Sequence, residues 1–127
     1  IGLGQACLDY LTRTSTYPSE DNKVELMEMH IHCGGPASTA LVTLSRLGIL
    51  TSFIGSISDD YFGSEIIKGL KKERVDTSFL KITPGYTSQF AFIVITRDTG
   101  KRTIFCILSL PSSKISAPRT ASMTWIR

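Results

Sequence analysis

The segment Cys33-Gly34-Gly35-Pro36-Ala37 decides the fold class, because it joins an alternating strand pattern to an amphipathic helix pattern. In residues 23–33 apolar and polar side chains alternate, and a switch between Leu26 and Met27 predicts a bulge or a change of strand partner. Pro36 suits the first turn of a helix and Gly48 its C-terminal cap. The apolar residues that recur between them at helical spacing are Ala37, Ala40, Leu41, Leu44 and Leu47.

The remaining elements also alternate between strand and helix. Residues 1–10 are typical of a buried strand that gives way to a loop, and residues 49–57 of a further strand. Ser58-Asp59-Asp60 predicts the cap of a second helix. The apolar side of that helix is formed by Phe62, Ile66, Ile67 and Leu70. Residues 88–96 and 102–108 predict two strands joined by a short hairpin loop, so the order of elements indicates an α/β fold.

Composition and charge exclude some classes of protein. The chain has 127 residues, of which 42% are hydrophobic and 20% charged, so it can fill a core and is not disordered by composition. Residues 109–127 carry Lys114, Arg119 and Arg127 without an acid, and these cations account for the whole net charge of +3. The neutral remainder lacks the basic face that a nucleic-acid-binding protein needs.

Targeting signals and a disulfide framework are not predicted. No apolar run approaches the roughly 18 residues that a membrane span needs, and the first residues lack the positively charged region of a secretory signal. Cys7, Cys33 and Cys106 are odd in number and far apart in the sequence, so we expect reduced thiols in the core or in strands. These features predict a soluble, cytoplasmic protein.

Two features predict a binding site for a hydroxyl-rich or anionic small molecule. Gly34 and Gly35 lead into the N-terminus of a helix, whose first N–H groups lack partners and whose dipole is positive there. Asp9 follows an apparently buried strand, where a carboxylate can accept two hydroxyls. The alternatives are a plain turn from strand to helix and a solvated turn aspartate.

Phosphate-binding signals elsewhere are weaker. Gly2 and Gly4 could begin a dinucleotide-binding fingerprint, but Cys7 stands at its third position and turn-like residues follow, so a nicotinamide-binding domain is a minor hypothesis. A Walker-type phosphate loop is not in the sequence. Arg102 is either an exposed cation of an edge strand or a phosphate contact.

Metal binding is also a minor hypothesis. His30 and His32 can share one face of a strand, but Cys33 points the other way and no second pair of ligands follows. A solvated strand face explains the histidines better. Asp59-Asp60 is better explained by helix capping than by a metal pair.

Taken in order, these motifs resemble the N-terminal part of the PfkB (ribokinase-like) carbohydrate kinases. The motifs that carry the resemblance are Gly2-Leu3-Gly4 with Asp9, Tyr17-Pro18, Cys33-Gly34-Gly35-Pro36-Ala37, Arg46-Leu47-Gly48, Phe53-Ile54-Gly55, Ser58-Asp59-Asp60, Phe62-Gly63 and Gly100-Lys101-Arg102-Thr103-Ile104. The segments 17–21, 102–104 and 109–111 are similar to those of ketohexokinase-like members. The resemblance covers residues 1–111 and leaves 112–127 as an unmatched basic tail.

The resemblance implies a Rossmann-like α/β core with a small β-sheet lid, whose strands would lie within residues 11–32 and 88–108. It implies transfer of the γ-phosphoryl group of ATP to a sugar hydroxyl with Mg²⁺, and in many members the lid also forms a homodimer. Asp9, Gly34 and Gly35 match residues that bind the sugar or a related polyol. Thr39 stands where asparagine is common and can still bind a hydroxyl, and Arg102 matches a lid arginine that in some members reaches toward the phosphates.

Other family features are missing from the sequence. Cys7 and Pro36 replace polar residues of the family pattern and offer a hydroxyl little. The second family signature, with its Gly-Ala-Gly-Asp anion hole and catalytic aspartate, and the ATP pocket are not in the chain. We therefore expect a truncated, sugar-binding portion that is inactive alone, binds neither ATP nor Mg²⁺ tightly and has marginal stability or self-associates. The alternative is a non-catalytic interaction module built from the lid strands.

Overall fold

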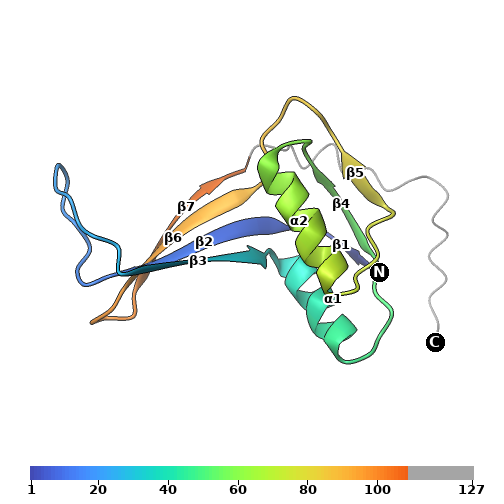
Figure 1. The fold of residues 1–127 in the computed structure, drawn as a ribbon, viewed down its shortest axis with the longest axis horizontal. Helices are drawn as coiled ribbons and strands as arrows, with labels where there is room; N and C mark the ends of the chain where they lie inside the picture. Colours follow the sequence, from blue (N-terminus) through green and yellow to red (C-terminus); the bar gives the residue numbers. More distant parts are fainter. Residues whose placement is uncertain (109–127) are drawn as a thin grey trace.

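A computed structural model describes residues 1–108 of the chain as a helix-covered body from which a long sheet projects (Figure 1). The elements, in chain order, are β1 (Gly2–Leu3), β2 (Cys7–Thr14), β3 (Glu28–Gly34), α1 (Pro36–Arg46), β4 (Phe53–Ile57), α2 (Tyr61–Lys72), β5 (Leu80–Ile82), β6 (Phe90–Thr96) and β7 (Arg102–Ile107). No helix among these residues has the length and apolarity to cross a membrane. The α/β fold that the sequence predicts is confirmed.

The body consists of a parallel sheet in the order β1-β4-β5 together with α1 and α2. Alternate residues of β4 are buried, which is the pattern of a strand whose one face packs on helices. The buried apolar residues that form this core are Ala6, Leu8, Leu41, Phe53, Ile57, Ile66, Leu70 and Val75. The two helices, β4 and the start of β2 therefore share a single core.

The projecting sheet, called the lid below, has the order β3-β2-β6-β7 (Figure 1). Its central strands β2 and β6 are parallel, and each outer strand is antiparallel to its neighbour. Every residue of β3 except Gly34 is exposed, and every residue of β7 except Thr103 is exposed. The lid is therefore held mainly by its backbone ladder and by its base.

The predicted helix and turn signals are confirmed. Pro36 lies in the first turn of α1, and Gly48 follows this helix with a positive φ of 85°. Asp60 caps α2 by accepting a hydrogen bond from the backbone N–H of Gly63 at 2.8 Å. Gly100, with φ 66°, allows the hairpin between β6 and β7.

Three details differ from the sequence-based expectations. Asp9 lies inside β2 and not in a loop, because the chain bends at Gly4 after a two-residue core strand and enters the lid at Cys7. The switch at Leu26 and Met27 marks the start of β3 and not a bulge, since the N–H of Met27 donates to the carbonyl of Arg13 at 2.8 Å and the regular ladder begins at the next residue. The edge strand β5 was not predicted, and residues 112–127 lie outside the described part of the chain.

Candidate functional site

The carboxylate of Asp9 lies against the backbone of Gly34, where the lid joins α1. In the β2–β3 ladder Cys7 is opposite Gly34 and Asp9 is opposite His32, so these side chains share one face of the lid. A Cβ atom added to Gly34 would overlap the carboxylate of Asp9. The predicted site residues Asp9 and Gly34 are therefore in contact, although they are 25 positions apart in the sequence.

Gly35 is required by the packing of the chain itself. Its φ of 101° is a conformation that residues with side chains rarely adopt. A Cβ atom at this position would also lie 2.6 Å from the carbonyl oxygen of Gln5 and 2.9 Å from the Cα of Ala6. The turn thus explains the glycine without a ligand, and a role of Gly35 in substrate binding stays a prediction.

The N-terminus of α1 presents hydrogen-bond donors beside Asp9. Its N-cap residue, Gly35, has no side chain to cap it, and Pro36 follows. The first-turn N–H groups of a helix have no carbonyl partner within the helix, and the positive end of the dipole lies there. A carboxylate that accepts and amides that donate therefore lie side by side, which is the arrangement that a ligand hydroxyl can satisfy from both sides.

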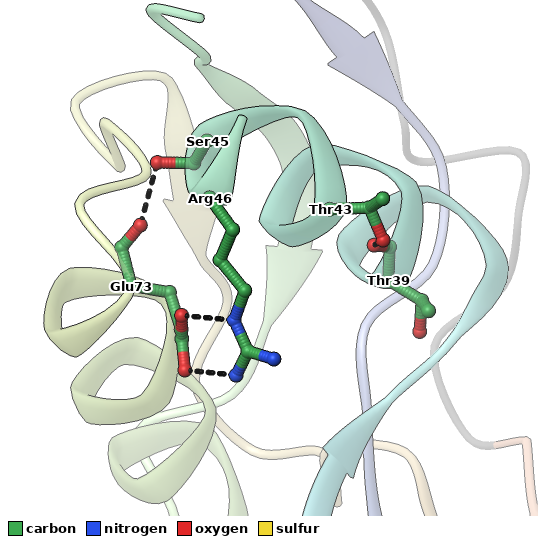
Figure 2. Close-up of polar contacts among 5 residues, drawn as sticks. All are labelled: Thr39, Thr43, Ser45, Arg46 and Glu73. Carbon is green, nitrogen blue, oxygen red and sulfur yellow. Dashed lines mark hydrogen bonds and ion pairs between the residues drawn. The ribbon is translucent and has the colours of Figure 1, made fainter. Parts of the chain in front are cut away.

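Thr39 lies in the same part of α1 and lines a groove of 410 Å³ between β3, α1 and α2. Its N–H donates to the carbonyl of Gly35 at 3.0 Å, and its carbonyl accepts from the hydroxyl of Thr43 at 2.9 Å. Its own hydroxyl lies away from the Arg46–Glu73 ion pair (Figure 2). The residue is exposed, so a ligand in the groove can reach it.

Arg46 and Glu73 also line this groove, and they take part in contacts between the two helices (Figure 2). Arg46 donates two hydrogen bonds to the carboxylate of Glu73, at 2.8 and 2.6 Å, and the hydroxyl of Ser45 donates to the carbonyl of Glu73 at 2.7 Å. The hydrogen bonds from Arg46 lower the pKa of Glu73. Because they join α1 to α2, these contacts fix the width of the groove.

Arg102 is not brought to Asp9. It is opposite Ile95, which is opposite Arg13, so all three lie on the same face of the lid as Asp9. Arg13 is four residues further along β2 than Asp9, which corresponds to about 13 Å of strand. The structure therefore places Arg102 near the outer end of the lid, and its contact with a phosphate stays a prediction.

The cysteines near the site have poorly reactive thiols. Burial, followed by the neighbouring carboxylate of Asp9, raises the pKa of Cys7. Cys33 is exposed as a residue, but its thiol packs on Gly69 of α2, and this partial desolvation raises its pKa, with smaller contributions from Glu65 and Asp9. Both thiols, like that of Cys106, are free and unpaired by disulfides. A thiol with a raised pKa stays protonated at neutral pH and is a weak nucleophile.

The described residues do not form a cation site. Across residues 1–108, no group of three histidine, cysteine or acidic side chains could hold a metal ion. His30 contacts Glu28 at 3.3 Å, and the rings of His30 and His32 are 6.2 Å apart. The sequence indicates a solvated face for both histidines and does not show that His32 lies directly opposite Asp9. Only the strand register reveals this, since alternation alone does not say which residue of β2 each histidine meets.

Comparisons with known proteins point to one family. A family model described as pfkB family carbohydrate kinase matches residues 3–118. The chain is 33% identical to a 5-dehydro-2-deoxygluconokinase of Geobacillus kaustophilus over 78 residues, or 61% of the chain and 22% of the relative. It is 26% identical to a nucleoside kinase of Methanothermobacter thermautotrophicus over 106 residues, or 83% of the chain and 34% of the relative.

Solved structures share the same fold. A candidate ribokinase from Agrobacterium tumefaciens has a TM-score of 0.81 and 30% identity, over 91% of this chain and 38% of that protein. A ribokinase from Arabidopsis thaliana, solved with ribose and ATP, has a TM-score of 0.72 over 84% of this chain and 35% of that protein, at 15% identity. The chain thus spans about a fifth to two fifths of the length of these proteins.

Proposed function

Because this chain belongs to the PfkB family of carbohydrate kinases, we propose that it is the polyol-binding portion of a sugar kinase. The observation that carries this proposal is the contact of the Asp9 carboxylate with Gly34 at the uncapped N-terminus of α1. Asp9 accepts hydrogen bonds from hydroxyls of the ligand, the first-turn amides of α1 donate to them, and Thr39 adds a further hydroxyl contact. The bound polyol is thereby oriented between the lid and the body.

The reaction of the parent family, phosphoryl transfer from ATP with Mg²⁺, needs groups that residues 1–108 do not supply. The described residues hold no cluster of carboxylates for a cation, and Asp9 lies against Gly34 and the positive end of α1. Residues 1–108 therefore do not fit Mg²⁺, and no step of the phosphoryl transfer is assigned to them. The chain alone binds a polyol without turning over ATP.

Sugar binding by the chain and by Asp9→Asn tests the proposal. Calorimetric titration with D-ribose, D-fructose and D-glucose is expected to show binding of at least one sugar. Loss of a hydrogen bond to a charged acceptor weakens that binding by about 10- to 100-fold in the variant. Asp59→Asn, a change in an exposed carboxylate outside the site, serves as the control and should bind like the parent. Equal affinity of Asp9→Asn and the parent chain would contradict the proposal.

Turnover is tested separately. The chain incubated with ATP, Mg²⁺ and each sugar should release no ADP above the rate without sugar. Sugar-dependent release of ADP, abolished by Asp9→Asn, would show that the missing groups are supplied by the chain after all.

A second function is favoured by the lid face opposite Asp9. Four exposed apolar side chains lie there, on the outer strands, and these are Met29, Ile31, Phe105 and Ile107. Contiguous exposed apolar surface marks an interaction site, and we propose a second copy of the chain as the partner. Light scattering after size-exclusion chromatography should show a dimer that Phe105→Glu dissociates. A monomeric parent chain at high concentration would rule this out.

A further inference from the structure

His32 differs from His30, its neighbour on the same face of the lid, because it lies directly opposite Asp9 and has no hydrogen-bond partner among residues 1–108. Residues directly opposite in an antiparallel pair have Cβ atoms about 4.5–5.5 Å apart, and Asp9 is opposite His32 in the β2–β3 ladder. The next residue of β3 on the same face is Gly34, which has no side chain. From β3, therefore, only His32 presents a polar side chain next to Asp9.

The neighbouring histidine on this face, His30, does have a polar partner. His30 contacts one carboxylate oxygen of Glu28 at 3.3 Å, and Arg13 contacts the other at 3.0 Å. His32 is exposed as a residue, and its imidazole ring has no hydrogen bond to any of residues 1–108, although it lies 6.2 Å from the ring of His30. The two histidines are thus on one face, two residues apart, with different environments.

His32 also lines the groove that contains Thr39. It is thus opposite Asp9 in the strand pair and lines the same groove as Thr39, and the sequence predicts sugar binding for both of these residues. The hydrogen-bonding chemistry of Asp9, of His32 and of a ligand hydroxyl is complementary. A carboxylate only accepts hydrogen bonds, a neutral imidazole offers one N–H donor, and a ligand hydroxyl can donate and accept at once.

We infer that His32 is a specificity-determining residue of the polyol site and donates to the ligand hydroxyl, or to its vicinal neighbour, that hydrogen-bonds to Asp9. This inference rests on the proposed function and names the ligand feature that is recognised, a vicinal diol. A ligand that lacks one of these two hydroxyls leaves either the carboxylate or the imidazole without its partner, and it binds more weakly as a result.

The test compares His32→Ala with His30→Ala, since both side chains are exposed, share one face and belong to the same strand. The sugar of D-ribose, D-fructose and D-glucose that binds tightest to the parent chain is titrated into each variant. His32→Ala is expected to weaken binding by about 3- to 10-fold, as for the loss of one neutral hydrogen bond. His30→Ala is expected to bind like the parent. Equal melting temperatures of the two variants show that neither unfolds.

A second readout separates contact from a structural effect. Imidazole signals in ¹⁵N-edited NMR spectra should shift for His32, and not for His30, when the sugar is added. The titration is then repeated with the matching deoxy sugar, which is 2-deoxy-D-ribose or 2-deoxy-D-glucose for the aldoses and 1-deoxy-D-fructose for fructose, or with another monodeoxy isomer. With this sugar the parent chain should no longer bind more tightly than His32→Ala.

The outcomes distinguish the two hypotheses. If a sugar binds with dependence on Asp9 but His32→Ala binds equally well and the His32 signals do not move, the inference about His32 is wrong and the proposed function stands. If none of the sugars binds to the parent chain, the proposed function is wrong, and the inference is wrong with it.

Discussion

The body and the lid of this molecule are stabilised in different ways. In the body, alternate residues of β4 are buried and the side chains of Phe53, Ile57 and Ile66 are at most 2% exposed. In the lid, the outer strands β3 and β7 are exposed along almost their whole length. Hydrophobic burial therefore stabilises the body, whereas the lid depends on its backbone ladder and on its attachment at the base. A sheet with two accessible faces can bind a ligand on one and a partner on the other.

The base of the lid is attached to the body at four places. The turn at Gly35 packs on the backbone of Gln5 and Ala6. The side chains of Tyr10, Phe62 and Phe90 pack together, and the rings of Phe62 and Phe90 stack with centroids 4.3 Å apart. The remaining attachments join α2 to the start of β6 and to the end of β3. Each can be removed separately, which makes the comparison between body and lid testable.

The largest effect is expected from a cavity in the body. Ile66→Ala removes a side chain of α2 that is 0% exposed, and such a change costs about 4 kcal/mol in the free energy of unfolding. Ile104→Ala removes the same group from β7, where the residue is 47% exposed, and costs about 0.5 kcal/mol. Urea denaturation of both variants measures the difference. Similar losses would show that the lid has a core of its own.

The next effect is expected at the turn between lid and body. Gly35→Ala places a Cβ against the carbonyl of Gln5 at a φ of 101° and should cost about 3 kcal/mol in unfolding free energy. Gly48→Ala is the matched control, because Gly48 also has a positive φ but no atom within 4 Å of the added Cβ. Its cost should be about 1 kcal/mol. If the two variants have the same melting temperature, the packing of Gly35 on Gln5 contributes nothing to stability.

A smaller effect is expected where α2 holds the start of β6. One oxygen of Asp60 accepts from the N–H of Gly63 and the hydroxyl of Ser88, at 2.8 and 2.6 Å, and the other accepts from the N–H of Ser88 at 2.8 Å. Asp60→Ala removes the helix cap and leaves buried groups of Ser88 without their acceptor, at a cost of about 2 kcal/mol at neutral pH. Asp59→Ala, at an exposed neighbour, should cost far less.

The same carboxylate predicts a dependence on pH. Burial raises the pKa of Asp60, but the hydrogen bonds from Ser88 and Gly63 outweigh it, so the pKa in the folded state is lowered. Its stabilisation is therefore complete above the ordinary aspartate pKa of about 4 and is lost as the pH falls through the lower folded value. The gap between the parent chain and Asp60→Ala should narrow below this range in denaturation series at several pH values. A gap that widens on acidification would contradict the assignment.

The smallest effect concerns the contact between α2 and the end of β3. A Cβ added to Gly69 would overlap the thiol sulfur of Cys33, so the helix carries a glycine where the lid packs on it. Gly69→Ala should cost about 1 kcal/mol despite the better helix propensity of alanine. In a Cys33→Ala background the same change should be better tolerated by about 1 kcal/mol. Additive effects of the two changes in thermal denaturation would mean that this contact does not join lid and body.

Local signals in the sequence predicted the elements with strong periodicity and clear ends. The helix after Pro36, the cap at Asp60 and the hairpin at Gly100 were all predicted from residue types that fit only a few backbone conformations. The predicted strand start was wrong, and so was the predicted bulge or change of strand partner near Met27, because alternation continues into irregular chain and β3 pairs with β2 along its whole length. The strand β5 was missed, since three residues are too short to show a period.

The α/β class, the turn at Gly34-Gly35 and a carboxylate near the first strand can all be predicted from residues that are neighbours along the chain. The folded arrangement is needed to show that Asp9 lies inside a lid strand, that its carboxylate meets Gly34 and that His32 is opposite it, whereas Arg102 is near the other end of the sheet. The physical reason is strand register, which is set by pairing between distant segments and by packing at the base of the lid. Local periodicity specifies which residues share a face, and pairing specifies which of them meet.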